Sequence, residues 1–174
     1  MIRHNVDLSR LMTFVEDARS DPARARRVQL VEGVWNTDEG PQFRAEIRFE
    51  KGAQIMEADQ PSTQGGDGRA PNPMLYCLFG LASCYAATFA TVAAIEGVEV
   101  RALRARAEGR VDHSRALGLS SDPPIEQIAL TLLVESPAGV EVLQRIQEEA
   151  RRRCPAVHCV TSPVRLQVAM EVVS

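Results

Sequence analysis

The residues best suited to chemistry in this sequence are its four cysteines, Cys77, Cys84, Cys154 and Cys159. A thiolate attacks peroxides and disulfides, and two thiols within reach of each other form a reversible disulfide. Cys77 and Cys84 lie in one predicted helix, about 10 Å apart along its axis, which is too far for a disulfide. Cys154 follows the second predicted core helix, and packing of the two helices can bring Cys84 and Cys154 together. This pair is therefore a candidate for thiol redox chemistry.

Each cysteine also fits a second interpretation, that of a small buried hydrophobe without reactivity. For Cys154 one observation opposes this interpretation. Its place before Pro155 suits the cap of a short helical turn, and the N–H groups of such a turn lower a thiol pKa. Cys154, His158 and Cys159 resemble part of a metal site, but their spacing is not that of a zinc knuckle and the sequence has no second Cys/His pair. We expect no metal and no cofactor.

The predicted helix that carries Cys84 runs from Asn72 to Glu96 and has no charged residue before Glu96. Pro73 suits a first helical position, and Gly97 suits the residue after the end. A helix that is apolar on every side must be enclosed by its own domain or by a partner chain. Several of its residues are small enough to let another helix come close: Gly80, Ala82, Ser83, Ala86 and Ala87.

The rest of the pattern predicts an α+β domain in which antiparallel sheets surround two central helices. Residues 42–50 alternate between apolar and charged side chains, as a half-buried antiparallel strand does. The predicted elements are a helix at 8–20, strands at 28–35, 42–50 and 54–57, the apolar helix, strands at 98–111 and 125–134, a helix at 137–153 and a strand at 164–173. We predict a single domain over residues 1–174, with residues 1–26 as an N-terminal helical extension.

A loop at 59–71 joins the first sheet to the apolar helix. Its glycines, Gly65, Gly66 and Gly68, are not followed by the Lys-Ser/Thr pair of a phosphate-binding loop. We expect the loop to deliver the chain to the start of the helix.

Composition narrows the class of protein. The chain has 174 residues, 45% of them hydrophobic, and a net charge of -3. A small negative net charge gives no general attraction to nucleic acid or to anionic lipid. The first residues lack the apolar core of a signal peptide, and the single apolar helix is too rich in Ala, Thr, Ser and Gly to be a convincing membrane span. We therefore predict no nucleic-acid or membrane partner and a reducing cytoplasmic location, where cysteines are thiols or redox centres.

One set of motifs resembles a known family. Gly65-Gly66, Pro71-Asn72-Pro73, the segment Leu81-Ala82-Ser83-Cys84, Gly97-Val98 and Cys154-Pro155 follow one another in the order and spacing of the OsmC/Ohr family. The match extends over residues 28–172, and the two cysteine segments together are fairly specific.

The resemblance implies an OsmC-like fold and an intertwined homodimer in which both chains line each active site. It also implies a thiol peroxidase. Cys84 attacks an organic hydroperoxide, Cys154 resolves the product as a disulfide, and a dithiol reduces that disulfide.

Two departures make the resemblance that of a divergent member of the family. Peroxidases of the family carry Glu directly after the Asn-Pro, where this chain has Met74, and an Arg in the turn at 36–40, where this chain has none. Arg69, Arg44 and Arg48 are the candidates to stabilise the thiolate instead.

Two alternatives to the enzyme remain open. One is an OsmC-like protein that binds a small hydrophobic ligand at the dimer cleft with inert thiols. The other is a purely structural scaffold.

Overall fold

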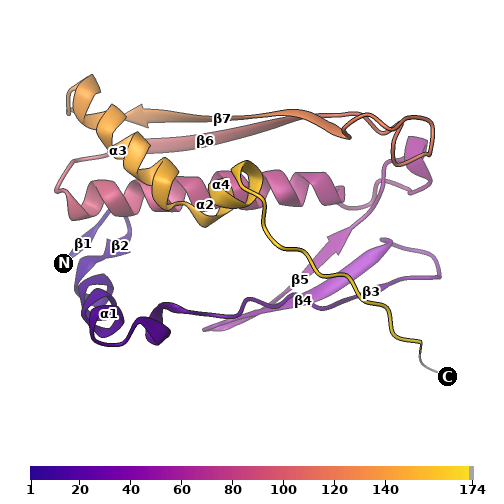
Figure 1. Cartoon of the computed structure of the whole chain (residues 1–174), viewed down its shortest axis with the longest axis horizontal. Coiled ribbons are helices and arrows are strands. Elements are labelled where there is room, and N and C mark those ends of the chain that lie inside the picture. The colour runs from indigo at the N-terminus through magenta and orange to yellow at the C-terminus, as the bar shows by residue number, and fades with distance from the viewer. Residues whose placement is uncertain (173–174) are drawn as a thin grey trace.

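The computed structural model describes residues 1–172 and confirms an α+β fold with antiparallel sheets. Its central helix, α2 (Pro73–Ile95), lies between a three-stranded sheet and a two-stranded sheet (Figure 1). Helices α3 (Val140–Arg153) and α4 (Pro155–Thr161) pack against α2. The sequence prediction of an apolar helix at the centre of the domain is thus correct.

Helix α2 begins and ends as its sequence predicts. Pro73 occupies the first turn, the Asn72 side chain accepts a hydrogen bond from the Leu75 amide at 3.1 Å, and Gly97 leaves the helix at φ 75°. Its buried residues include Tyr85, Phe89 and Val92, and these form the core together with Ile146 and Ala150 of α3 and with Cys154. The core therefore sits where α2 meets α3.

The N-terminal sheet contains β3 (Gly33–Trp35), β4 (Phe43–Phe49) and β5 (Gly52–Ala58) in that order, all antiparallel. Its register pairs Phe43 with Ala58 and Phe49 with Gly52. The predicted strand at 28–35 is wrong over its first half, because only Gly33–Trp35 finds a neighbour. Val28 and Leu30 are 94% and 78% exposed in this chain. Alternating apolar residues form a strand only where another strand is available to pair with them.

The second sheet is the hairpin of β6 (Ala102–Val111) and β7 (Ile125–Glu135). Alternate residues of β6 are partly buried on the side that packs on α2, while the arginines between them are exposed. The strand predicted at 98–111 begins at Ala102, because Val98 is still tied to the end of α2 by its amide, which bonds to the Ala93 carbonyl.

The C-terminal part departs most from the sequence prediction. The helix expected at 137–153 begins at Val140, and α4 continues the one turn expected after Pro155 into a seven-residue helix. The strand expected at 164–173 is not formed over residues 164–172, and Val173 lies outside the described residues. This segment runs away from α4 without a paired neighbour (Figure 1), and Leu166 and Val168 are 83% and 87% exposed.

The N-terminal segment adds a hairpin that the sequence did not predict. Strands β1 (Ile2–Arg3) and β2 (Val6–Asp7) lead into α1 (Leu8–Ser20) and the 3-10 turn η1 (Pro22–Ala25). The turn residues His4 and Asn5 have positive φ. The hairpin lies at the C-terminal end of α2, where His4 Nε2 is 2.8 Å from the Val98 carbonyl oxygen. Arg3 Nη1 also donates to the Ala94 carbonyl at 3.5 Å, so that the hairpin contacts a carbonyl in the last turn of α2.

The loop at 59–71, which includes the 3-10 turn η2 (Ser62–Gln64), is folded around one carboxylate. Asp59 is 2% exposed, and its Oδ2 accepts hydrogen bonds from the amides of Asp67 at 3.3 Å and Arg69 at 2.9 Å. Gly66, directly before Asp67, is tightly enclosed: a Cβ on Gly66 would overlap the Gln60 carbonyl and lie 2.8 Å from Asp59 Oδ1. These contacts hold the loop in one compact conformation before α2 begins.

We expect Gly66→Ala to destabilise the fold by about 2 kcal/mol, because the added methyl has no room without a backbone shift. The matched control is Gly139→Ser, since Gly139 precedes α3 with open space around its Cα and a serine suits that helix cap. Chemical denaturation measures both free energies of unfolding. Equal stabilities for Gly66→Ala and the unmodified chain would contradict this description of the loop.

Candidate active site

Cys154 stands at a forced break between two helices. Pro155 has no N–H to donate and disfavours the α conformation in the residue before it, so α3 stops at Arg153 and Cys154 adopts φ -74° and ψ 117°. The Cys154 amide still bonds to the Ala150 carbonyl at 2.9 Å, and its carbonyl accepts from the His158 amide at 3.0 Å. Cys154 is therefore held from both sides at the junction of α3 and α4.

The structure brings Cys84 and Cys154 together. Cys84 lies in the middle of α2, and the two sulfur atoms are 3.6 Å apart, with the Cys154 thiol as donor to the Cys84 sulfur. The residues are 70 positions apart in the sequence. Both are free thiols in this structure. Of all the cysteines, this is the pair that sequence reasoning singled out.

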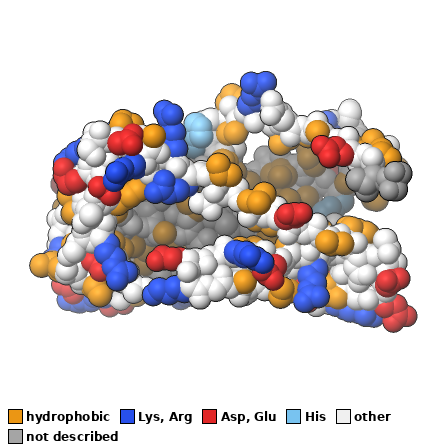
Figure 2. Space-filling model, turned by 90° about the horizontal axis from the view of Figure 1, so that it is seen from below, with side chains coloured by type: hydrophobic (Ala, Val, Ile, Leu, Met, Phe, Trp, Pro, Cys, Tyr) orange, Lys and Arg blue, Asp and Glu red, His pale blue; other side chains and the backbone are white. Residues whose placement is uncertain are grey.

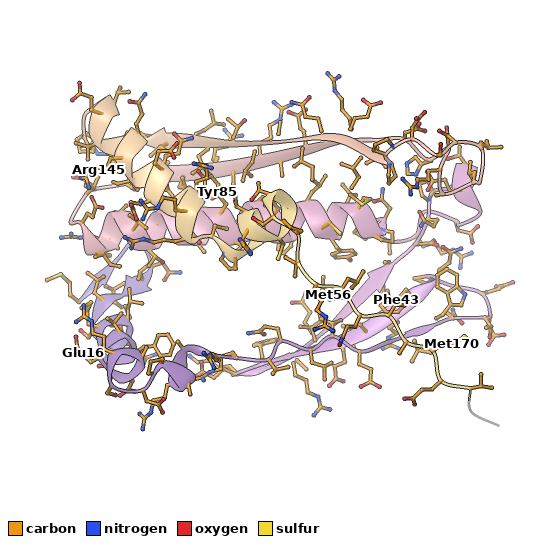
Figure 3. The ribbon with its side chains drawn as sticks, in the orientation of Figure 1. Glu16, Phe43, Met56, Tyr85, Arg145 and Met170 are labelled. Atoms are coloured by element: carbon orange, nitrogen blue, oxygen red, sulfur yellow. The ribbon has the colours of Figure 1, made fainter. Side chains whose placement is uncertain are left out.

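The two thiols differ in burial. Cys154 is 1% exposed and packs with Ile146 and Ala150, while Cys84 is partly exposed. Tyr85, labelled in Figure 3 between α2 and α3, fixes the helices at this point, because its hydroxyl donates to the Gln147 carbonyl at 3.3 Å. Cys84 is thus the thiol of the pair that a substrate reaches first.

Burial raises the pKa of Cys84 above the usual value for a thiol, because the thiolate is the form that loses hydration. The backbone N–H of Ala156, in the first turn of α4, partly offsets this by stabilising the thiolate. The negative charge that Cys154 and Cys159 carry when ionised raises the pKa of Cys84 further. At neutral pH Cys84 is therefore mostly in the thiol form.

The arginines proposed from the sequence form ion pairs elsewhere in this chain. Arg69 Nη2 is 2.8 Å from Asp67 Oδ2, Arg48 Nε is 2.8 Å from Glu46 Oε1, and Arg44 Nε is 4.0 Å from Glu57 Oε1. No arginine of the described residues is among the groups that shift the pKa of Cys84. Their role as thiolate stabilisers stays a prediction.

Two further thiols lie near the pair in the fold and are exposed. Cys77 is on α2, two turns before Cys84, and Cys159 is on α4, five residues after Cys154. His158, also exposed, lies beside Cys159 on α4. Among residues 1–172, no three His, Cys, Asp or Glu side chains are grouped closely enough to hold a metal ion.

A pocket of about 370 Å³ with mostly apolar lining lies between α2, β7, α3 and α4. Leu81 and Tyr85, which flank Cys84 along α2, form one wall, and Val157 and Val160 of α4 form another. Gln147 and Arg151 of α3 supply the polar part of its lining. This volume is in the range of small-molecule sites.

Sequence reasoning missed the backbone N–H of Ala156 and the hydroxyl of Tyr85. No signal in the sequence could have found them. A backbone amide carries no residue-type signature, and an apolar run such as that around Tyr85 does not say which aromatic side chain reaches a neighbouring helix.

Comparison with known proteins places this geometry in a family. The profile of the family described as OsmC-like protein matches residues 65–169, which include both Cys84 and Cys154. Among proteins with curated descriptions, none matches the chain significantly.

Solved structures have the same fold. An OsmC-like protein from Mycoplasma pneumoniae is 19% identical and superposes with a TM-score of 0.57 over 77% of this chain and 87% of its own. An organic hydroperoxide resistance protein OsmC from Legionella pneumophila is 15% identical, with a TM-score of 0.56 over 78% and 90%. An organic hydroperoxide resistance protein from Elizabethkingia anophelis is 16% identical, with a TM-score of 0.56 over 78% and 91%.

At these identities the superpositions establish the fold, and the profile match establishes the family. The chain is a member of the OsmC-like protein family.

Proposed function

We propose that this protein is a thiol-dependent peroxidase that reduces organic hydroperoxides through Cys84 and Cys154. The observation that carries the proposal is the 3.6 Å separation of their sulfurs, between a partly exposed thiol and a buried one. Organic hydroperoxide resistance proteins among the structural neighbours support it.

In the first step the Cys84 thiolate attacks the outer oxygen of the hydroperoxide. The O–O bond breaks, the alkoxide takes up a proton and leaves as the alcohol, and Cys84 becomes a sulfenic acid. The hydroperoxide is reduced by two electrons, and the Cys84 sulfur is oxidised by two.

In the second step Cys154 attacks the sulfenic sulfur, and water leaves as the Cys84–Cys154 disulfide forms. A disulfide bond is about 2.05 Å long, so that the sulfurs must approach by roughly 1.5 Å, which side-chain rotation and a small helix shift supply. A dithiol reductant then returns both cysteines to thiols and is itself oxidised to a disulfide.

The raised pKa of Cys84 requires a partner for efficient attack. Among residues 1–172 the Ala156 amide is the one group that lowers this pKa, and Arg44, Arg48 and Arg69 form ion pairs elsewhere. We infer that an arginine of a second copy approaches Cys84 and stabilises the thiolate.

The substrate we propose is a hydroperoxide with an apolar body, such as a fatty or aryl hydroperoxide. The pocket of about 370 Å³ against α2, the helix that carries Cys84, has apolar walls from α2, β7 and α4, including Leu81, Leu130 and Val157. Such walls favour an apolar substrate over hydrogen peroxide, because burial of apolar surface stabilises the complex.

We also propose a homodimer. One stripe of α2, Leu75, Phe79, Ser83 and Ala87, is exposed in the single chain, and Phe79 is 67% exposed. Opposite it, the inner face of the N-terminal sheet has an apolar hollow of about 460 Å³, to which Phe43 and Met56 contribute (Figure 3). Figure 2 shows the molecule hollowed at the centre of the face seen from below. An apolar surface of this extent is typical of an interface.

Membrane insertion is the other way to cover such a helix. By length and composition alone, α2 could cross a membrane, but the core helix of a folded domain meets the same criteria. Because α2 carries the buried Tyr85 and Phe89 core, we propose a dimer without a membrane partner, located in the reducing cytoplasm.

The second candidate function is binding of a small hydrophobic ligand with inert thiols. The raised pKa of Cys84 and the apolar pocket both favour it, as does Met74 in the position where peroxidases of the family have Glu. A ligand retained in native mass spectrometry, together with slow reaction of Cys84 in thiol titration, would favour this candidate.

We expect Cys84→Ser to abolish consumption of cumene hydroperoxide in the presence of a dithiol, because the attacking sulfur is gone. Cys154→Ser should still consume one equivalent of hydroperoxide rapidly, because Cys84 is intact, but it should form no Cys84–Cys154 disulfide. The matched control is Cys77→Ser, an exposed thiol on the same helix, which should react as the unmodified protein does. A normal rate in Cys84→Ser would refute the proposal.

The rate of the first step should rise with pH. A raised pKa leaves Cys84 mostly protonated at neutral pH, so that the thiolate fraction, and with it the rate, increases about tenfold per unit until the pH passes the pKa. Stopped-flow measurement of sulfenic acid formation between pH 6 and 9 tests this. A rate that is independent of pH over this range would mean that the thiolate is already formed.

We expect a particle of twice the 19.1 kDa chain mass in solution. The unpaired C-terminal segment contributes alternating apolar side chains to the contact, so that Leu166→Asp should weaken the dimer. The matched control is Gln167→Asp, on the opposite side of the same extended segment. Analytical ultracentrifugation measures both, and a monomeric unmodified protein at micromolar concentration would contradict the dimer.

A further inference from the structure

Cys159 lies in the last turn of α4, the helix whose first turn contacts Cys84. The Ala156 amide acts on the Cys84 sulfur, and Cys159 lies three residues later, on the same face of the helix one turn on. Side chains in this relation have Cβ atoms about 5–6 Å apart. Cys159 also belongs to the groups whose charge acts on Cys84. Because α4 packs directly on α2, Cys84 and Cys159 share one neighbourhood.

The three thiols differ sharply in access. Cys154 is 1% exposed, Cys84 is partly exposed and Cys159 is exposed. A dithiol reductant must reach a sulfur of the disulfide before it can exchange with it. In a Cys84–Cys154 disulfide, one of the two sulfurs is closed to solvent, and the other is partly covered.

We propose that Cys159 is a second resolving thiol, which replaces Cys154 in the disulfide with Cys84 and so transfers that bond to the protein surface. The inference rests on the proposed chemistry of Cys84. The Cys159 thiolate attacks the Cys84 sulfur, the Cys84–Cys154 bond breaks, the Cys84–Cys159 bond forms, and Cys154 leaves as a thiolate that takes up the proton released by Cys159. No electrons are gained or lost by the protein in this exchange.

Cys159 also resolves the Cys84 sulfenic acid when Cys154 is absent. The Cys84 sulfenic acid and the Cys159 thiol then condense to a disulfide and release water. Cys159 pairs with Cys84 and not with Cys154, because five residues of helix separate the latter two by about 7.5 Å along the axis, which exceeds the reach of a disulfide.

The short helix permits the approach. Helix α4 has seven residues, none of them fully buried, and it ends at Ser162, where an exposed segment begins. Its first turn packs on the core through Ala156 and Val157, so that the movement needed is one of its last turn, which carries the exposed Cys159.

The direct test oxidises the Cys154→Ser protein with one equivalent of cumene hydroperoxide and, in a parallel arm, with diamide, which joins neighbouring thiols whether or not the protein is a peroxidase. Peptide mass spectrometry of the single-chain band identifies the linked cysteines. We expect a Cys84–Cys159 peptide in both arms. Cys154→Ser/Cys77→Ser is the matched control and should give the same peptide.

In Cys154→Ser/Cys159→Ser the linked peptide should be missing, and the hydroperoxide arm should leave a Cys84 sulfenic acid that dimedone labels. If Cys154→Ser itself keeps a dimedone-reactive Cys84 and a free Cys159, and diamide gives no linkage, the inference fails while the proposed peroxidase stands. If diamide links Cys84 to Cys159 but the hydroperoxide is not consumed, the proposed function fails instead.

A second measurement leaves Cys154 in place. The oxidised protein is mixed with dihydrolipoamide, and the reappearance of thiols is followed with time. Reduction should be several-fold slower in Cys159→Ser than in Cys77→Ser or the unmodified protein. Equal rates in all three would show that the reductant attacks the Cys84–Cys154 disulfide directly and would overturn the exchange step.

Discussion

The structure depends on the break that Pro155 imposes on the C-terminal helical region. Without an N–H and with a ring that excludes the α conformation from the preceding residue, Pro155 stops α3 and turns Cys154 into an extended junction. A continuous helix would carry Cys154 past α2. The break instead holds the Cys154 sulfur against Cys84. It also starts α4 at a position from which the Ala156 amide interacts with the Cys84 sulfur.

A second constraint is the apolarity of α2. Its core side, with Tyr85, Phe89 and Val92, is covered by the rest of the chain, whereas Phe79 and the residues in line with it are not. The exposed segments at 26–32 and 162–172 have the same character, since apolar residues alternate there without a neighbouring strand. The proposed dimer would cover these three surfaces and the hollow in the N-terminal sheet with a second copy of the chain.

Much of this arrangement follows from the sequence. The limits of α2 follow from Pro73 and Gly97, and the β4–β5 and β6–β7 pairs follow from alternation and intervening turns. The pairing of Cys84 with Cys154 follows from their positions relative to the two core helices. Strands 28–35 and 164–173 could not be assigned correctly for a single chain, because a period of two predicts a strand only if a neighbour exists. The hairpin at Ile2–Asp7 was missed because two-residue strands have no detectable period. The electrostatics of Cys84 depend on burial and on one backbone amide, which a linear pattern does not contain.

The central claim is that Cys84 and Cys154 act as one redox unit. Its most direct test is to titrate the fully reduced protein with an organic hydroperoxide, without reductant, and to count and map the remaining thiols as the reaction proceeds. The account predicts that each equivalent of hydroperoxide removes two thiols and that the first disulfide formed joins Cys84 to Cys154. It is contradicted if the hydroperoxide survives with Cys84 still free, or if Cys84 is oxidised to a sulfinic acid while Cys154 stays a thiol.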